Sequence, residues 1–306
     1  MFHVKHITEC NSCVVMRRDT SATGFFYLAE RNEYMGKVIS IANQKGGVGK
    51  TTTAINLSAC LAEAGMKVLV IDMDPQGNTT SGLGVEKDEL EYSTYDLLLC
   101  ECTFNQALIK TEFENIDIIP SDVDLAAAEV DLLGIENKEY ILKSHLMTTK
   151  NRYDYVIIDC PPSLNTLTLN ALSCSDSVVV PIQCEYYALE GLSQLMHTIE
   201  LVKERLNSKL KIDGVVFTMY DGRTNLSLQI VDTVKDNLNQ HIYSSLIPRN
   251  VRLAEAPSFG KPIIHYDSRS VGAEAYRGLA KEIMTADGKK YAVKEKKKPF
   301  FLRKEK

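Results

Sequence analysis

A glycine-rich stretch with two lysines and two threonines could bind phosphate: Lys45-Gly46-Gly47-Val48-Gly49-Lys50-Thr51-Thr52. It follows the β-branched run Val38 to Ala42 and leads directly into a pattern of helical period. In a strand, turn and helix of this order, backbone N–H groups close around phosphate oxygens, and the helix N-terminus adds the positive end of its dipole. Lys50 would reach the β- and γ-phosphates of a nucleotide, and the Thr51 hydroxyl would ligate Mg²⁺.

This stretch departs from the usual phosphate-binding motif G-x-x-x-x-G-K-[ST]. Gln44 occupies the position, five before Gly49, at which that motif has its first glycine. A lysine, Lys45, stands immediately before the glycine pair instead. The loop therefore carries a second cation beside the expected Lys50.

Three aspartates follow two other apolar runs. Asp72 and Asp74 come at the end of the run that starts at Lys67, and Asp159 ends the run Tyr155 to Asp159. Open α/β sheets bind their ligands at the carboxyl ends of parallel strands, so we expect these carboxylates beside the phosphate loop. Carboxylates next to phosphates predict a site for Mg²⁺ and an activated water.

These motifs resemble the ParA/Soj/MinD branch of P-loop ATPases, with a deviant Walker A loop. Two longer blocks, Val179 to Leu192 and Ile247 to Pro262, resemble the same branch. The resemblance extends from Lys37 to about Met284 and is strongest to Soj-like chromosome-partitioning ParA proteins. It implies a P-loop NTPase fold and a slow, Mg²⁺-dependent hydrolysis of ATP.

The resemblance also implies roles in the nucleotide site. Residues 45–52 would bind ATP, with Pro248 near the adenine. Thr51, Asp72 and Asp159 would hold or support Mg²⁺, and Asp74 would position the attacking water. Lys45 would act with Lys50 in catalysis by reaching the nucleotide of a partner subunit, which implies an ATP-dependent sandwich homodimer.

Two arginines match positions that contact DNA in this family. They are Arg223 and Arg252, and they imply non-specific binding of double-stranded DNA by the ATP-bound dimer. A ParB/Spo0J-type protein bound to parS would stimulate hydrolysis and release the dimer. The implied output is chromosome or plasmid partitioning, with control of replication initiation or sporulation left open. The implied location is cytoplasmic and nucleoid-associated.

The rest of the sequence predicts one α/β domain that can position this site. Apolar strand patterns alternate with helical ones, which is typical of a mostly parallel, twisted sheet with helices on both faces. We expect an N-terminal extension (1–34), an ATPase domain (35–286) and a basic tail (287–306). Expected strands are Val38 to Ala42, Lys67 to Asp72, Ile116 to Ile119, Tyr155 to Asp159, Ser177 to Pro181, Gly214 to Thr218 and a short one near Ser245 to Ile247. Expected helices are Lys50 to Ala64, Leu125 to Leu133, Lys138 to Asn151, Leu189 to Leu206, Leu226 to Asn239 and Gly272 to Met284.

Composition excludes several classes of protein. The 306 residues are 44% hydrophobic and 25% charged, with a net charge of −5, which disfavours wholesale coating of nucleic acid. The eight cysteines come without a secretory signal and predict reduced thiols, and no apolar stretch is long enough to cross a membrane. The tail from Ala286 carries nine Lys/Arg against three Asp/Glu, so it is a basic end on an acidic chain.

The first 34 residues have two interpretations. His3, His6, Cys10 and Cys13 are metal-binding types, but they crowd together without the usual separation between ligand pairs, which disfavours a zinc site. Residues 1–6 can instead be encoded by a DNA palindrome that resembles parS. We therefore expect the segment to be a translated regulatory leader, with Met35 as the true start.

Three other functions share some of these motifs. A MinD-like, membrane-associated ATPase that positions the division site is the main alternative, but Pro299 and a small apolar cluster make residues 296–306 a poor amphipathic helix. An iron-protein-like reductase would need cluster ligands, for which Cys160 and Cys174 are the nearest candidates. A non-enzymatic adaptor is disfavoured by the full set of lysines and aspartates.

Overall fold

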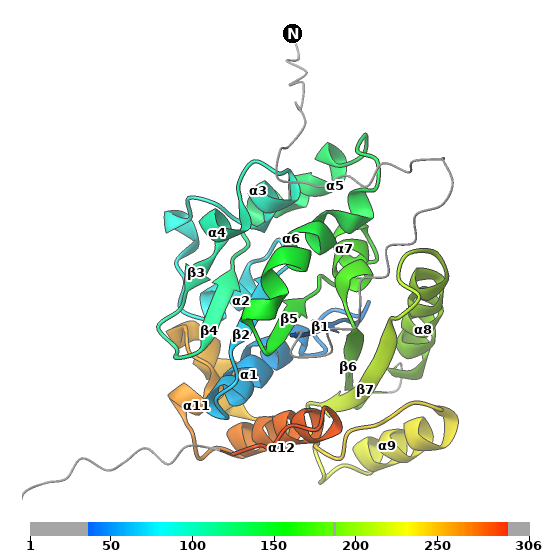
Figure 1. Ribbon diagram of the computed structural model, residues 1–306. Coiled ribbons are helices and arrows are strands. Elements are labelled where there is room, and N and C mark those ends of the chain that lie inside the picture. The colour runs from blue at the N-terminus through cyan, green and yellow to red at the C-terminus, as the bar shows by residue number, and fades with distance from the viewer. Residues whose placement is uncertain (1–35, 186–187, 293–306) are drawn as a thin grey trace, which may run out of the picture.

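One mostly parallel sheet with helices on both faces forms the framework of the protein in a computed structural model that describes residues 36–185 and 188–292 (Figure 1). Within this part of the chain, seven strands lie in the order β3-β4-β2-β5-β1-β6-β7. All neighbours are parallel except β3 and β4. The strands are β1 (Lys37–Ile41), β2 (Val68–Asp72), β3 (Ile109–Lys110), β4 (Ile116–Ile119), β5 (Tyr155–Asp159), β6 (Ser177–Gln183) and β7 (Lys211–Thr218).

Helices connect these strands. The α-helices are α1 (Lys50–Glu63), α2 (Asn78–Gly82), α3 (Thr94–Leu98), α4 (Phe104–Ala107), α5 (Ala128–Asp131), α6 (Ile141–Thr149), α7 (Thr166–Cys174), α8 (Ala188–Arg205), α9 (Asn225–Asn237), α10 (Val251–Glu255), α11 (Ile263–Tyr266) and α12 (Val271–Ala286). Short 3₁₀ turns are η1 (Lys87–Glu89), η2 (Val123–Ala127), η3 (Lys138–Tyr140), η4 (Lys150–Arg152) and η5 (Ala256–Phe259). The predicted fold class, a mostly parallel sheet covered on both faces, is confirmed.

Both faces of the sheet are buried in separate apolar clusters. One cluster contains the inward sides of α1, α11 and α12, and the other those of α3, α6, α7, α8 and α9. Because both faces are covered, the central strands are apolar along their whole length, with β2 and β5 buried at every position. This is why these strands stood out in the sequence.

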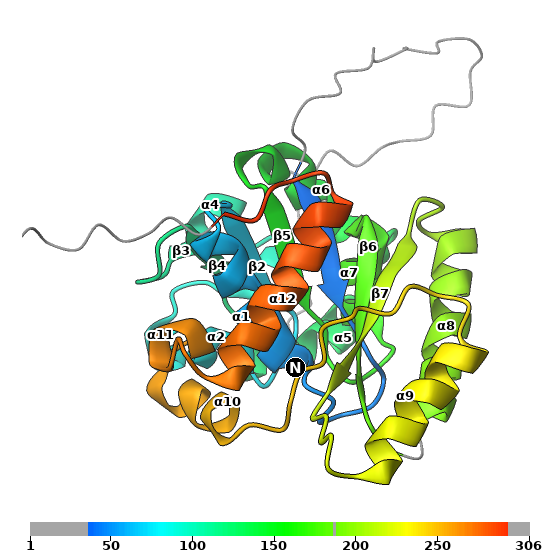
Figure 2. The ribbon, with the colours of Figure 1, turned by 90° about the horizontal axis from the view of Figure 1, so that it is seen from below.

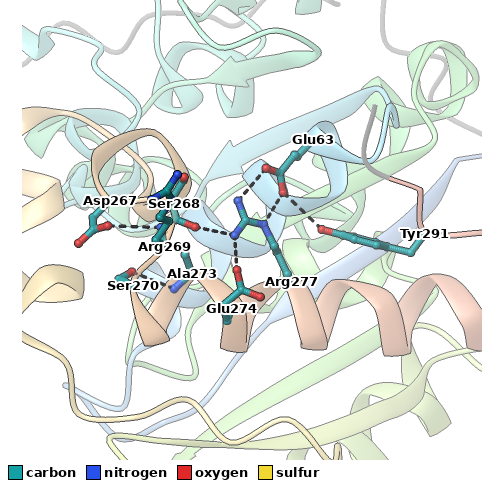
Figure 3. Close-up of polar contacts among 9 residues, drawn as sticks. All are labelled: Glu63, Asp267, Ser268, Arg269, Ser270, Ala273, Glu274, Arg277 and Tyr291. Atoms are coloured by element: carbon teal, nitrogen blue, oxygen red, sulfur yellow. Dashed lines mark hydrogen bonds and ion pairs between the residues drawn. The ribbon is translucent and has the colours of Figure 1, made fainter. Parts of the chain in front are cut away.

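Helix α12, the last one in the part of the chain that the structure describes, packs against α1, which follows the glycine-rich stretch. Figure 2 shows α12 crossing α1, and the Tyr276 hydroxyl lies 3.2 Å from the Thr53 hydroxyl between them. Arg277 of α12 donates two hydrogen bonds, of 2.7 and 2.8 Å, to the carboxylate of Glu63 at the end of α1 (Figure 3). The same guanidinium also bonds Glu274 and the carbonyl of Ser268. Since Arg277 is only 18% exposed, these bonds hold α12 against α1 with little screening by water.

The structure corrects some expected elements. The strand expected near Ser245 to Ile247 is wrong, because the chain there makes only isolated bridges, Val215 with Ile242 and Tyr220 with Pro248. The helix expected over Leu125 to Leu133 is a 3₁₀ turn followed by the short α5. The antiparallel strand β3 was not predicted, since a two-residue edge strand leaves no periodic pattern.

The structure describes little of the two ends of the chain. The zinc and leader interpretations, and the Met35 start, fall on residues outside those described. So does most of the basic tail, and the expected domain boundaries stay predictions. Among the described residues, no helix combines the length and apolar character needed to cross a bilayer.

Candidate nucleotide site

The glycine-rich stretch forms a loop between β1 and α1. The backbone of Gly49, with φ of 85°, is in the left-handed region that favours glycine, and α1 begins at the next residue. Asn43 anchors the start of the loop, since its amide donates to the Pro181 carbonyl (2.7 Å) and its Oδ1 accepts from the Lys45 N–H (3.0 Å). At the other end, the Thr218 hydroxyl donates to the Val48 carbonyl (2.8 Å). The loop is thus fixed to β6 and β7.

Lys50 points its ammonium back into this loop. Its Nζ donates to the Lys45 carbonyl at 3.1 Å, and the residue is only 6% exposed. Burial lowers the pKa of Lys50, while the charge of Asp159 opposes that shift. A buried ammonium inside a loop of backbone N–H groups is suited to bind an anion.

Asp72 and Asp159 lie opposite each other on the paired strands β2 and β5. Both are fully buried, and burial raises the pKa of each carboxyl; repulsion from Asp72 raises that of Asp159 further. The cost of burying the Asp72 carboxylate is partly offset by Thr80, whose N–H and hydroxyl both donate to Asp72 Oδ2 at 2.8 Å. The structure therefore brings together two acids that repel each other.

One oxygen of this pair has no partner. Asp159 Oδ2 accepts from the hydroxyls of Thr51 and Thr79, both at 2.8 Å, but Asp159 Oδ1 is buried without a hydrogen bond from any described residue. An unsatisfied buried carboxylate oxygen costs free energy unless a cation or its water shell engages it. Oxygen donors at this position fit Mg²⁺, which favours carboxylate and water ligands.

Asp74 begins a tight turn beyond the end of β2. Its N–H donates to Asp72 Oδ1 (3.2 Å), and its Oδ1 accepts from the Gln76 N–H (3.0 Å). Ser121, after β4, donates its hydroxyl to the Asp74 carbonyl at 2.8 Å. The turn closes at Gly77, where φ is 60° and a Cβ would come within 2.5 Å of the Ser121 carbonyl oxygen. Only glycine fits there, and we call residues 74–77 the Asp74 loop.

Lys45 lies at the outer side of the phosphate loop. Its ammonium pairs with Glu185 at 2.9 Å, and the two side chains are 36% and 47% exposed. Unlike Lys50, it is bonded away from the loop interior and is accessible to a second molecule.

Pro248 lies in a segment that runs parallel to β7 and pairs with Tyr220 just beyond its end. Tyr220 donates its N–H to the Ile247 carbonyl and accepts from the Arg249 N–H, both at 3.0 Å. Since Thr218, two residues before Tyr220, bonds the phosphate loop, this segment lies along the same edge of the sheet.

The two arginines expected to contact DNA lie outside this cluster, and carboxylates pair with both. Arg223 is 89% exposed and donates two hydrogen bonds to Asp221, at 2.8 and 2.7 Å. Arg252, on α10, is 54% exposed and lies 3.0 Å from Glu255 and 3.6 Å from Asp267. The hydrogen bonds with Asp221 and Glu255 raise the pKa of Arg223 and Arg252, respectively.

Several residues of the site were missed in the sequence. They are Asn43, Thr79, Thr80, Ser121, Glu185 and Thr218, which support the loop or the aspartates rather than forming a motif. A signal existed for Thr79 and Thr80, since hydroxyl side chains just after an Asp-rich turn are suited to bond its carboxylates. The expected strands Ile116 to Ile119 and Gly214 to Thr218 end near this edge, but nothing in the sequence shows which groups Ser121 and Thr218 bond there.

Comparisons with known proteins place this site in a family. A profile described as an AAA domain matches residues 36–212. The sporulation initiation inhibitor protein Soj of Bacillus subtilis (strain 168) is 57% identical over 249 residues, which cover 81% of this chain and 98% of that protein. The chromosome partitioning protein ParA of Myxococcus xanthus (strain DK1622) is 51% identical over 253 residues, covering 83% and 89%.

Solved structures agree with these relatives. The septum site-determining protein MinD from Pyrococcus horikoshii OT3, complexed with Mg-ADP, is 29% identical with a TM-score of 0.70, covering 83% of this chain and 98% of that one. A cobyrinic acid a,c-diamide synthase from Mycobacterium smegmatis, with bound ADP and magnesium, is 38% identical with a TM-score of 0.74, covering 85% and 99%. From the site, the fold and these matches together, the chain belongs to the Soj/ParA family of chromosome-partitioning proteins.

Proposed function

We propose that this chain is a Mg²⁺-dependent ATPase that acts as a switch in DNA partitioning. The observation that carries the proposal is the unpartnered Oδ1 of Asp159, which lies in the cluster that holds Thr51 and adjoins the loop around Lys50. A relative from Treponema pallidum (strain Nichols), 47% identical over 256 residues, is named the chromosome-partitioning ATPase Soj. ATP-bound dimers would bind DNA, and hydrolysis would release them.

Residues of the phosphate loop would bind and orient the nucleotide. Residues 46–52 would hold the phosphates through backbone N–H groups, and Lys50 would neutralise the β- and γ-phosphates. Lys50 Nζ donates one hydrogen bond to the Lys45 carbonyl, and its other two N–H groups would donate to phosphate oxygens. Thr51 and Asp159 would hold Mg²⁺, with Asp72 in support, and the metal would screen the charge that develops on the γ-phosphate. Pro248 would border the adenine.

Hydrolysis would depend on Asp74 and Lys45. The bonds from Gln76 and Ser121 fix the turn that carries Asp74, so its carboxylate can orient a water for attack. Lys45 would leave Glu185 and reach the nucleotide of a second subunit, which completes the site only in a two-fold dimer. Hydrolysis by the isolated chain is therefore expected to be slow.

Arg223 and Arg252 would contact DNA phosphates. Guanidinium groups bind phosphate without reading sequence, and each contact releases counterions, so binding weakens as salt rises. Both arginines would exchange their carboxylate partners for phosphates. Such binding would concentrate the protein on the nucleoid within the cytoplasm. We assign these activities to residues 35–286, flanked by the N-terminal extension and the basic tail.

The test is ATP hydrolysis measured with the chain alone, with double-stranded DNA, and with DNA plus the ParB/Spo0J-type protein encoded in the same genome. We expect a low basal rate, dependence on Mg²⁺, and the highest rate with both additions. An unchanged rate with both would refute the partitioning proposal. Liposome flotation with ATP tests the MinD-like alternative, because ATP-dependent flotation would favour membrane attachment over DNA.

A further inference from the structure

Two adjacent threonines of α2 contact the two buried aspartates. Thr79 donates its hydroxyl to Asp159 Oδ2 at 2.8 Å, and Thr80 donates its N–H and its hydroxyl to Asp72 Oδ2 at the same distance. Both threonines are fully buried. Successive residues of a helix project about 100° apart, and neighbouring strands lie about 4.8 Å apart, so one turn of helix can reach the ends of both β2 and β5. The start of α2 therefore covers the acid pair.

Close packing fixes the place of α2. Gly82, at its end, lies so near Ile55 of α1 that a Cβ there would overlap the Ile55 side chain. Gly77, just before its start, is confined in the same way by the Ser121 carbonyl. Because the backbone is held at both ends, the Thr79 hydroxyl has little freedom to leave its acceptor. Thr79 is thus a fixed donor.

Two hydroxyls donate to the same oxygen of Asp159. Thr51 also donates to Oδ2, at 2.8 Å, while Oδ1 is buried without a hydrogen bond from any residue that the structure describes. The terminal torsion of aspartate is broad and roughly two-fold, so a carboxylate that is held weakly can exchange its two oxygens. Exchange in Asp159 would have to break both hydrogen bonds. The two threonines therefore keep Oδ1 as the oxygen that is left for a cation.

Thr51 alone is less suited to hold Asp159. A hydroxyl has one proton and two lone pairs, so Thr51 can ligate Mg²⁺ and donate to Asp159 together. Its oxygen is then shared between the metal and the carboxylate, and it moves with any adjustment of the phosphate loop. Thr79 comes from another helix, so its bond to Asp159 does not depend on the position of that loop.

We propose that Thr79 is a positioning residue for Mg²⁺, because it keeps Asp159 Oδ1 available to the metal and so raises the affinity of the site. This inference rests on the proposed function, since it concerns the metal of the same nucleotide site. Hydrogen bonds to a ligating carboxylate orient it, and losing such a partner typically weakens metal binding about 10–100-fold. We expect the lower end of that range, since the bond from Thr51 would remain.

Magnesium titrations of the full chain test the assignment without relying on hydrolysis. The probe is a fluorescent ADP analogue, whose binding is measured first in EDTA and then at rising concentrations of Mg²⁺. Thr79→Val keeps the branched shape of the side chain and removes its hydroxyl. We expect this variant to raise the Mg²⁺ concentration of half-maximal effect about tenfold. Binding in EDTA should not change, because Thr79 bonds Asp159 rather than the phosphate loop.

Three further variants show whether the hydroxyl itself is responsible. Thr79→Ser restores the donor and should titrate like the unchanged chain, whereas Thr79→Ala should titrate like Thr79→Val and replaces it if that variant does not fold. Thr149 supplies the matched control, since it is 4% exposed and donates its hydroxyl to the His145 carbonyl at 2.8 Å within α6. Thr149→Val should lower the melting temperature and leave the Mg²⁺ titration unchanged.

A second measurement follows the metal directly. Mn²⁺ favours the same carboxylate and water ligands as Mg²⁺, and electron paramagnetic resonance detects its free form. In the presence of ADP, Thr79→Val should weaken Mn²⁺ binding by a factor similar to that for Mg²⁺. A role limited to stabilising the fold would lower the melting temperature of Thr79→Val without changing either metal titration.

The outcomes distinguish this inference from the proposed function. Metal titrations of Thr79→Val that match those of the unchanged chain would overturn the inference. Loss of analogue binding in EDTA would overturn it too, since the effect would then lie in the phosphate loop, and so would a Thr79→Ser variant that fails to restore the titration. If the metal titrations turn out as expected but DNA and the ParB-type protein never stimulate hydrolysis by the unchanged chain, the role of Thr79 stands and the partitioning proposal fails.

Discussion

Replacing Gly77 by alanine tests whether the Asp74 loop depends on its contact with Ser121. Alanine at φ of 60° would have its Cβ 2.5 Å from the Ser121 carbonyl oxygen, where ordinary contact begins near 3.4 Å. Gly65 is the matched control, because it also has a positive φ, of 87°, but a Cβ there meets nothing within 4 Å. Gly65→Ala therefore measures the cost of the backbone conformation alone, about 1–2 kcal/mol.

Gly77→Ala adds the cost of the overlap to that of the backbone. Overpacking in a close contact costs about 1–3 kcal/mol, so we expect Gly77→Ala to reduce the free energy of unfolding by about 1–3 kcal/mol more than Gly65→Ala. Urea unfolding of both variants, with unchanged denaturant slopes, gives the difference. Because Ser121 also bonds the Asp74 carbonyl, Gly77→Ala should lower stimulated hydrolysis while ATP binding persists. Equal stabilities, or full stimulated hydrolysis in Gly77→Ala, would refute the reasoning.

Three further predictions concern charged groups of the site and the surface. Lys45→Ala should keep ATP binding but lose ATP-dependent dimerisation, whereas Glu185→Gln should keep both, as measured by nucleotide titration and light scattering. Arg223→Ala with Arg252→Ala should abolish DNA binding in gel shifts and leave dimerisation intact, while Asp221→Asn, which frees Arg223, should increase affinity for DNA. Asp159→Asn should raise the melting temperature of the nucleotide-free protein more at pH 8 than at pH 5, and should weaken Mg²⁺-ATP binding. The sign follows from burial and Asp72, which raise the pKa of Asp159 in the folded state, so ionisation destabilises that state increasingly as pH rises above the unfolded pKa. A melting-temperature difference that is larger at pH 5 would contradict this last expectation.

Sequence patterns predicted the elements that are specified by neighbouring residues along the chain. The buried strands that end at Asp72 and Asp159 were predicted from their apolar runs, and the turn before Lys50 from its glycines. The sequence predicted only that Asp72 and Asp159 lie at the same edge of a parallel sheet. It did not predict that they lie directly opposite each other. Their register is a property of strand pairing, which no single run of sequence specifies.

The supporting contacts could not be predicted for the same reason. Thr218 bonds the loop across 170 positions of sequence, and Ser121 meets Asp74 across 47. Threonine and serine are common in loops, so their types carry little information about such partners. A short strand was expected near Ser245 to Ile247, but this segment runs parallel to the end of β7 and makes only isolated bridges with it and with Tyr220.

The hydrogen bonds between Arg277 and Glu63 affect when the protein can fold during its synthesis. Helix α1 is among the first elements to leave the ribosome, and the helix that covers it, α12, is the last one described. Until α12 emerges, the buried side of α1 that packs on Tyr276 has no cover, and Glu63 has no cation. Contacts between such distant parts of a chain form late, since the loop that joins them must close first. Synthesis therefore yields a nearly complete chain before it yields a fully supported nucleotide site, and a ribosome that stops before residue 277 leaves a protein without that support.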